Sequence, residues 1–153
     1  MTIPEKYNIE NLDEFHLSFI LSTISRQHSI YLNHQLQEYN ITAGEYPIIM
    51  KLYKEDKKTQ NQIAKSFGLT EGSIARTIRH LEDKKIIKRK INQENRRQNF
   101  VYLTRKGMKI ASIIEDVESK WEKNINYSLN SDEFKKLKET LYYISIESLD
   151  LNK

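Results

Sequence analysis

Apolar residues spaced three and four positions apart recur along most of this chain and predict a mainly helical protein. The first such run extends from about Asn11 to Glu38 with no glycine or proline inside it, which predicts one long amphipathic helix. Its apolar positions are Leu12, Phe15, Phe19, Leu21, Ile24, Ile30, Tyr31 and Leu36. A helix of that length is longer than one small core needs.

The next helix is predicted from a capping box at Thr42 and Glu45, whose side chains are spaced to bind the free amides of a helix start. Pro47 falls within the first two turns, where a proline is tolerated best. The apolar positions of this short helix are Ile48, Ile49 and Leu52. We expect the charged loop 54–58 to end it.

A helix-turn-helix unit is predicted from residue 59 onward. Thr59 and Gln62 form a second capping box, and Gly68 is placed to end the helix in a left-handed conformation. Thr70 then caps a second helix at once. The apolar positions are Ile63, Ala64 and Phe67 in the first helix and Ile74, Ala75, Ile78 and Leu81 in the second.

After residue 85 the period of the apolar positions changes from that of a helix to that of strands. Residues 86–91 and 100–103 predict a hairpin, and the polar run 92–99 between them predicts a long basic tip. Thr104 is then expected to cap a helix that extends to about Ile125. Its apolar positions are Ile110, Ile113, Ile114, Val117 and Trp121.

The last helix is predicted to begin at residues 131–133, where a serine cap is followed by two carboxylates that suit the positive end of the helix dipole. We expect its buried side to consist of Leu137, Leu141, Ile144 and Leu149. Trp121, Tyr142 and Tyr143 are interpreted as core and interface aromatics.

Composition is consistent with one globular domain and excludes several mechanisms. The 153 residues are 38% hydrophobic and 30% charged, with 4 glycines and 2 prolines. The absence of cysteine excludes disulfides, thiolate metal sites and thiol sensing. The chain starts without a basic region or cleavage site, and its apolar stretch 15–21 is interrupted by polar residues, so we expect a cytoplasmic protein.

Charge is distributed unevenly along the chain. Residues 54–109 contain 16 lysines and arginines against 6 acidic residues, a net charge of +10, whereas the rest contains 9 basic and 15 acidic residues. A basic middle between acidic flanks indicates a polyanionic partner. On charge alone, a solvated lysine-rich surface without such a partner is the alternative.

The second helix of the helix-turn-helix unit is predicted to be a DNA recognition helix. Its exposed side carries Thr70, Glu71, Gly72, Ser73, Arg76, Thr77, Arg79 and His80. In a major groove an arginine can make two hydrogen bonds to a guanine edge, serine and threonine reach phosphates or bases, and a glycine allows close approach. The alternative is that Arg76 and Arg79 only make the helix soluble.

The predicted hairpin supplies a second set of cations. Lys88, Arg89 and Lys90 are expected to bind phosphates as positioning contacts. The tip contains no apolar residue, and its guanidinium groups, Arg96 and Arg97, are expected to enter a minor groove. Narrow A·T-rich tracts concentrate negative potential there.

The run TQNQIAKSFGLTEGSIARTIRHLEDKKIIKRKINQENRRQNFVYLTRKG, residues 59–107, resembles the MarR family of winged-helix regulators. The wing pattern of that family, D-x-R-S-x-x-V-x-L-T-x-x-G, falls on Asn95, Arg97, Gln98, Val101, Leu103, Thr104 and Gly107. The order of the helices on either side also agrees, so the resemblance accounts for nearly the whole chain.

The resemblance implies a mainly α fold with a small β-hairpin wing. It implies a winged helix-turn-helix lobe at 41–107 and dimerisation helices at 1–40 and 108–153. It further implies a triangular homodimer that binds a near-palindromic site in double-stranded DNA and is often released by a small anionic aromatic ligand.

Three positions depart from the family pattern. Asn95 replaces an aspartate that, by resemblance, orients the wing arginine, so Arg97 would be held by a neutral hydrogen bond. Gln98 replaces the usual serine. Lys85 stands where a glycine commonly ends the recognition helix, and a left-handed conformation there would cost about 1 kcal/mol relative to glycine.

A ligand-responsive protein needs a cation to hold a carboxylate, and Arg26 is our candidate. It is the only lysine or arginine between Lys6 and Lys51. The alternative is a salt bridge from Arg26 to an acidic residue of another helix. His28 is a weaker candidate, for which a core or surface role is the alternative.

The sequence favours no catalytic or metal site. His16, His28, His34 and His80 form no pair four residues apart and have no carboxylate cluster of ligand spacing beside them. There is no nucleophile with a base, no glycine-rich phosphate loop and no H-E-x-x-H, so we expect neither an enzyme nor a cofactor. We therefore predict a transcriptional regulator, most simply a repressor. An architectural or protein-interaction module that uses the winged fold without sequence choice is the alternative.

Overall fold

The computed structural model describes residues 9–93, 95, 98–126 and 128–151, which fold mainly into helices with one small antiparallel sheet. The chain divides into two compact units, Met1–Ala43 and Gly44–Lys153. The second unit contains the helix-turn-helix and the sheet that the sequence predicts, so it is the unit that positions the candidate site.

In the first unit, the apolar run that predicts a single helix forms three shorter ones. They are the 3-10 helix η2 (Ile9–Glu14), α1 (Leu17–Gln35) and the 3-10 helix η3 (Gln37–Tyr39). The prediction of one continuous helix is therefore wrong. His16 interrupts it with an extended backbone and no capping side-chain bond, and Asn40 ends it at a left-handed φ of 55°. Asparagine is among the few residues that tolerate this conformation.

Helix α2 (Tyr46–Glu55) starts later than predicted. Its N-cap residue is Glu45, whose side chain makes no capping bond, so the capping box predicted at Thr42 and Glu45 is wrong. The Glu45 carboxylate is buried and instead accepts hydrogen bonds of 2.7 and 2.8 Å from Nζ of Lys84. Pro47 occupies the second helical position, where its missing N–H costs no helix bond.

The helix-turn-helix forms as predicted, from α3 (Gln60–Ser66) and α4 (Glu71–Asp83). The Thr59 hydroxyl accepts from the amide of Gln62, whose side chain accepts from the Thr59 amide, so the capping box at α3 is confirmed. Gly68 has a φ of 62° in the turn. The Thr70 hydroxyl caps α4 by accepting from the Ser73 amide.

The predicted hairpin is part of a three-stranded antiparallel sheet. Strands β2 (Ile87–Ile91) and β3 (Asn99–Leu103) pair with each other, and β1 (Lys58–Thr59), which the sequence does not reveal, pairs with the other edge of β3. At the base of the tip, the Asn92 amide donates to the Gln98 carbonyl at 3.0 Å, and the Asn92 residue is buried.

Helices α5 (Arg105–Ile125) and α6 (Ser131–Asp150) complete the second unit. The Thr104 hydroxyl caps α5 as predicted, by accepting from the Gly107 amide. The cap of α6 is Asn130 and not Ser131, because the Asn130 side chain accepts from two amides and forms a capping box with Glu133. The serine prediction is therefore wrong by one residue.

The apolar side of α6 is not buried within this chain, contrary to the prediction from its pattern. Leu141 and Ile144 are half-buried, and Leu137 and Leu149 are exposed. Trp121 on α5 is half-buried. Tyr142 and Tyr143 are 62% and 66% exposed, so in the single chain they are not core residues. A long helix with this much exposed apolar surface indicates a further contact.

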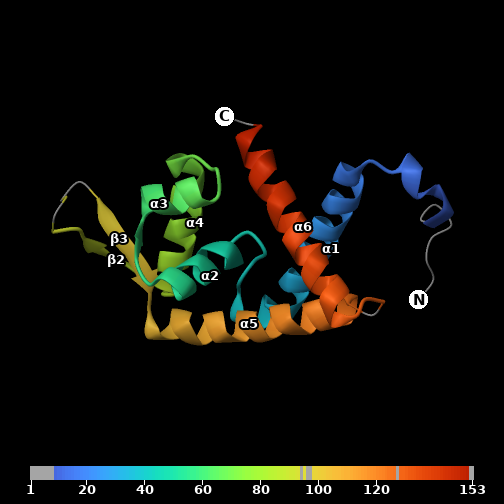
Figure 1. Ribbon diagram of the computed structural model, residues 1–153. Coiled ribbons are helices and arrows are strands. Elements are labelled where there is room, and N and C mark those ends of the chain that lie inside the picture. Colours follow the sequence, from blue (N-terminus) through green and yellow to red (C-terminus); the bar gives the residue numbers. More distant parts are fainter. Residues whose placement is uncertain (1–8, 94, 96–97, 127, 152–153) are drawn as a thin grey trace. The chain divides into compact units, whose positions relative to one another are not determined.

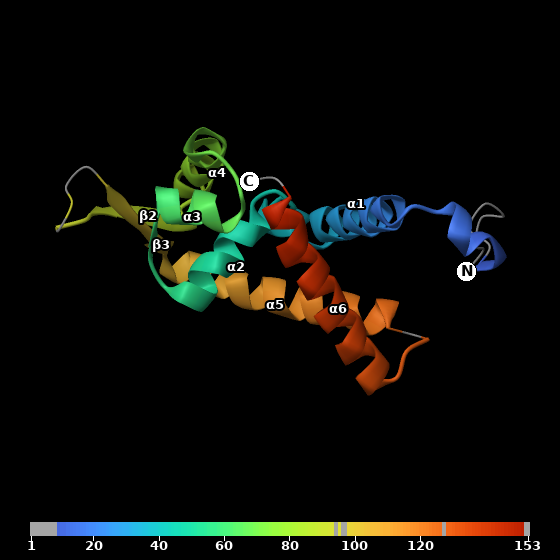
Figure 2. The same ribbon diagram turned by 45° about the horizontal axis from the view of Figure 1, so that its top comes forward.

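The core of the second unit lies between α2, α3, α4, the sheet and α5. Helix α2 lies along α5, and the β2–β3 hairpin projects at the end of α5 where that helix begins (Figures 1 and 2). The fully buried side chains include Ile49, Leu52, Ile63, Ile78, Leu81, Ile86, Ile87, Val101 and Ile114.

The end of α4, the start of β2 and the start of α5 meet at one tight junction. Lys85 has a left-handed φ of 59°, as the sequence indicates for the position of the missing glycine. The Thr104 hydroxyl donates to the carbonyl of Lys85 at 2.7 Å, and the Thr104 amide donates to that of Ile86 at 2.9 Å. A Cβ added to Gly107 would overlap the Ile86 carbonyl oxygen, so a glycine is required there.

We expect Gly107→Ala to destabilise the protein by about 3 kcal/mol, because the new methyl group must displace backbone at this junction. Urea unfolding followed by circular dichroism measures the change. Gly72→Ala is the matched control, since the nearest atom to an added Cβ is 4.0 Å away and alanine favours a helix by about 1 kcal/mol. Equal stability of the two variants would contradict this account of the junction.

Candidate nucleic-acid interface

Helix α4 has distinct sides. Its buried stripe consists of Ile74, Ile78 and Leu81. Because each residue turns the helix by about 100°, Gly72, Arg76 and Arg79 point away from that stripe, and all three are exposed. The side chains on one flank are Ser73, Thr77 and His80, of which Ser73 and His80 are exposed.

The outward side of α4 matches most of the predicted recognition set. Arg76 and Arg79 lie within one turn of each other and are both exposed. Ser73 is less available, because its hydroxyl donates to the Thr70 carbonyl at 3.1 Å. Thr70 is likewise engaged as the helix cap. The arginines are therefore the groups with free reach into a groove.

The three cations of β2 do not act as one group, since neighbouring strand residues point to opposite faces of a sheet. Lys88 lies opposite Tyr102 on β3, with its Nζ 5.0 Å from the centre of that ring. Lys90 lies on the same face and is exposed. Arg89 points to the other face, toward α4, where its guanidinium is 2.9 Å from the Glu82 carboxylate.

The predicted residues at the tip are only partly within the described structure. Asn95 is exposed, and its carbonyl accepts from the Gln98 amide at 2.9 Å. Arg96 and Arg97 lie outside the described residues. Their role in a minor groove remains a prediction from the sequence.

Glu71 is held by the preceding helix. Its carboxylate accepts from Nδ2 of Asn61 at 2.5 Å, and its backbone carbonyl accepts from Nε2 of Gln60 at 3.2 Å. These bonds join the start of α3 to the start of α4. Sequence reasoning missed Gln60 and Asn61, although two amide side chains directly after a helix cap were the available signal.

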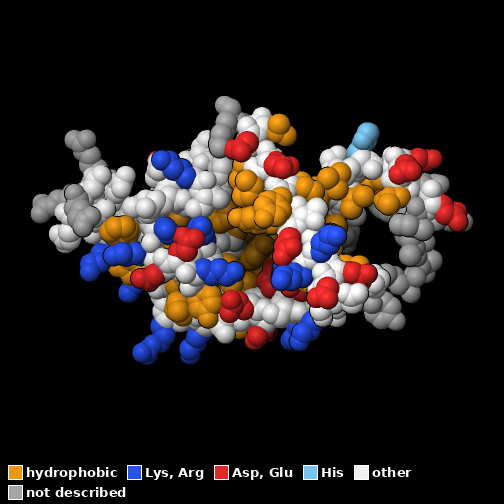
Figure 3. Space-filling view, viewed as in Figure 1, with side chains coloured by type: hydrophobic (Ala, Val, Ile, Leu, Met, Phe, Trp, Pro, Cys, Tyr) orange, Lys and Arg blue, Asp and Glu red, His pale blue; other side chains and the backbone are white. Residues whose placement is uncertain are grey.

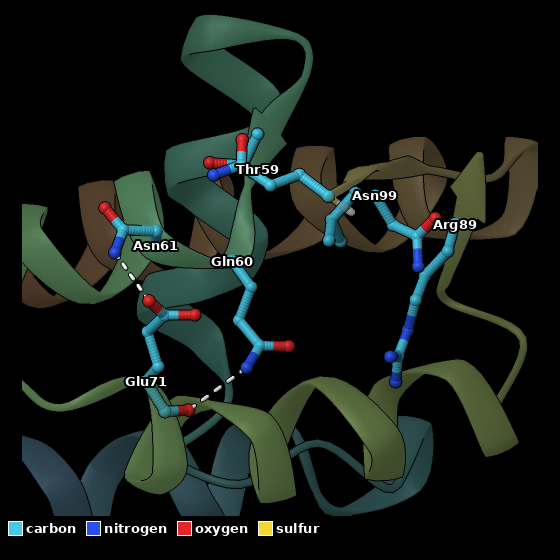
Figure 4. A pocket seen from close by; sticks show the side chains of 8 residues that line it. Thr59, Gln60, Asn61, Glu71, Arg89 and Asn99 are labelled. Atoms are coloured by element: carbon cyan, nitrogen blue, oxygen red, sulfur yellow. Dashed lines mark hydrogen bonds between the residues drawn. The ribbon is translucent and has the colours of Figure 1, made fainter. Parts of the chain in front are cut away.

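These side chains line a polar pocket of about 200 Å³ between α3, α4 and the sheet. Figure 4 shows Asn61 and Gln60 reaching Glu71 on one side, and Arg89 extending from β2 toward α4 on the other. The lining residues are Thr59, Gln60, Asn61, Glu71, Arg89, Gln98, Asn99 and Val101. The pocket therefore lies between the start of α4 and strands β2 and β3.

Local pairs neutralise some of the charge around this lobe. Glu55, at the end of α2, lies between Lys51 and Lys58, and hydrogen bonds from both ammonium groups lower the pKa of its carboxyl. Burial, together with the nearby Glu118 carboxylate, raises the pKa of Tyr46. Both groups lie on α2.

Arg26 and His28 lie on α1 in the first unit. Arg26 is exposed and makes no ion pair with any described residue, and His28 is half-buried. Two residues apart on a helix, their side chains point in different directions, so α1 does not converge them on one ligand.

The described part of the chain offers neither a metal cluster nor a membrane span. No three histidine, aspartate or glutamate side chains there lie close enough together to hold a metal ion. None of its helices combines the length and the apolar character that crossing a bilayer requires.

The sequence of this chain is similar to those of known transcriptional regulators. A sequence model of the MarR family matches residues 41–98. The HTH-type transcriptional regulator BilQ of Clostridioides difficile (strain CD3) is 25% identical over 137 residues, which cover 90% of this chain and 93% of BilQ.

Solved structures agree with the fold. A crystal structure of MarR superposes with a TM-score of 0.82 at 26% identity, covering 99% of this chain and 98% of that one. The Staphylococcus aureus MepR–DNA complex superposes with a TM-score of 0.78 at 26% identity, covering 88% and 99%. These matches confirm the predicted fold class, mainly α with a small β wing.

Proposed function

We propose that the chain is a transcriptional regulator of the MarR family and that it binds a near-palindromic operator in double-stranded DNA as a homodimer. In this proposal α4 enters the major groove and reads base edges with Arg76 and Arg79. The wing lies over the adjacent minor groove, with Lys88 and Lys90 on phosphates and Arg96 and Arg97 at its tip.

The observation that carries this proposal is the arrangement of cations in the second unit. The outward side of α4 presents exposed arginines, and the wing beside it presents exposed lysines. A related protein of the same fold, MepR, was solved with DNA. In a twofold dimer, two such helices would enter successive major grooves about 34 Å apart.

Apolar surface on α1 and α6 supports a second copy of the chain as the partner. Large apolar side chains exposed on these helices are Leu17, Phe19, Ile24, Ile30, Leu137, Tyr142, Tyr143, Ile146 and Leu149. Figure 3 shows hydrophobic side chains gathered along α6. We propose that helices within 1–40 and 108–153 form the dimer and that 41–107 form the DNA-binding lobe.

The proposal includes repression that a small aromatic carboxylate relieves. Arg26 supports it, as an exposed cation in an acidic flank with no ion pair to a described residue. His28 is a second candidate contact, although it points in a different direction on α1.

Arg76→Ala and Arg97→Ala are each expected to weaken operator binding by about 1–3 kcal/mol, because each removes a groove contact. Fluorescence anisotropy with the chain's own upstream DNA measures the loss at fixed salt. Lys120→Ala, an exposed cation on α5 outside the lobe, is the control. Parent-like binding by either arginine variant would refute the role of that arginine.

The same assay separates a regulator from an architectural module. A regulator should bind its upstream DNA far more tightly than random duplex across a salt series, whereas an architectural protein shows only the shared electrostatic contribution. Equal affinities at every salt concentration would favour the architectural module.

Tyr143→Glu is expected to convert the homodimer to a monomer, because it places an uncompensated charge in the proposed interface. The side chain is 66% exposed in the single chain, so the fold of the chain itself should be retained. Light scattering after gel filtration measures the mass, with the exposed Lys136→Glu on the same helix as the control. A parent of single-chain mass would overturn the dimer proposal.

Salicylate-like compounds at millimolar concentration are expected to raise the melting temperature and lower operator affinity, since a ligand that favours one state shifts both equilibria. Arg26→Ala should abolish both effects if its guanidinium holds the carboxylate. An unchanged melting temperature and unchanged operator binding in the parent would count against this class of effector.

A further inference from the structure

One flank of α4 carries two carboxylates, Glu71 and Glu82. They are eleven residues apart, which is about three turns, so they lie on the same side of the helix, between the buried stripe and the outward side. This flank faces α3 and β2, and each carboxylate is bound by a side chain from one of those elements. Figure 4 shows the bond from Asn61 to Glu71. Glu71 binds Asn61 of α3, and Glu82 binds Arg89 of β2.

The ion pair with Glu82 engages Arg89, so Arg89 is less available to DNA phosphates than the exposed lysines and arginines around it. The two side chains are 32% and 38% exposed, so solvent reaches both. An ion pair at that level of exposure contributes little to stability, and a phosphate is a competing partner of the same charge. Glu82 therefore competes with phosphates for Arg89 but does not hold the arginine permanently.

The position of these carboxylates separates the two kinds of DNA binding. Binding to any duplex depends on cations meeting phosphates, whereas binding to an operator also needs α4 to hold a fixed position against base edges. The bond between Glu71 and Asn61 holds the start of α4 against α3, whereas Glu82 occupies Arg89 and places negative charge beside the arginines of α4. Both effects lower the affinity for random duplex relative to the affinity for a matching operator.

We propose that Glu82 withholds Arg89 from phosphates, that Glu71 positions the recognition helix through Asn61, and that together they favour an operator over non-cognate duplex. This inference rests on the proposed DNA-binding function. It assigns Glu71 a role different from the base or phosphate contact that the sequence suggests.

Glu82→Gln tests the first half of the proposal, because glutamine keeps the shape and an acceptor for Arg89 but removes the charge. Random-duplex affinity should rise roughly fivefold at 0.1 M salt, and the slope of log K against log salt should steepen by about 0.9, as for one added phosphate contact. Operator affinity should change less than about twofold, so the specificity ratio falls.

A double-mutant cycle identifies Arg89 as the released cation. In an Arg89→Ala background, Glu82→Gln should leave the salt slope for random duplex unchanged. Asp116→Asn, the same change of charge at an exposed position of α5, is the control and should leave DNA binding unchanged. A steeper slope that persists without Arg89, or that Asp116→Asn reproduces, would overturn the proposal for Glu82.

Glu71 is tested by a pair of variants. Glu71→Gln keeps an acceptor for Asn61, so operator affinity should be retained, whereas Glu71→Ala removes the bond and should weaken operator binding roughly fivefold. If Glu71 instead accepts a hydrogen bond from a cytosine, Glu71→Gln also weakens operator binding, and only at sites with that base pair. That result would overturn the positioning role.

These outcomes are separable from failure of the proposed function. If the parent protein bound the operator no more tightly than random duplex, sequence-specific regulation would be refuted. The Glu82 and Arg89 cycle on random duplex would still report whether the ion pair withholds a cation from phosphates.

Discussion

The ion pair between Glu45 and Lys84 is the contact on which the rest of the winged helix-turn-helix unit depends. The carboxylate side chain is 6% exposed, so removal of its ammonium partner would leave a buried charge and cost about 3–5 kcal/mol. That is a large part of the stability of a typical domain. Lys84 also marks the end of α4, and its carbonyl accepts from Lys106 of α5. One pair thus ties α2, α4 and α5 together.

The positions of the individual lysines and arginines matter more for binding a polyanion than the net charge of this segment. The net charge of +10 over residues 54–109 attracts a polyanion, but the individual cations have different partners. Lys84 and Lys58 form ion pairs with carboxylates of the chain itself, and Arg89 forms one with Glu82. Arg76 and Arg79 face outward. A count of lysines and arginines predicts the partner, whereas only the structure shows which of them that partner can reach.

The sequence predicts the elements whose signals are local. The capping box at Thr59, the cap at Thr70 and the left-handed Gly68 depend on interactions within a few residues, and all of them form. The spacing of Glu45 from Thr42 predicts a cap, yet the Glu45 carboxylate binds a lysine 39 residues away. The Asn61–Glu71 and Arg89–Glu82 contacts likewise join different elements, and no periodicity reveals them. Strand β1 has only two residues and no pattern of its own.

A single residue, Thr104, separates β3 from α5, and both its amide and its hydroxyl are bonded across the junction. The sheet and the long helix therefore have no hinge between them. A helix of 21 residues is about 31 Å long, so a tilt of about 5° made at the end distant from the sheet displaces the end beside Thr104 by about 3 Å. Helix α5 thus acts as a lever, because a small change of angle at the end distant from the sheet moves the wing by about the length of a hydrogen bond.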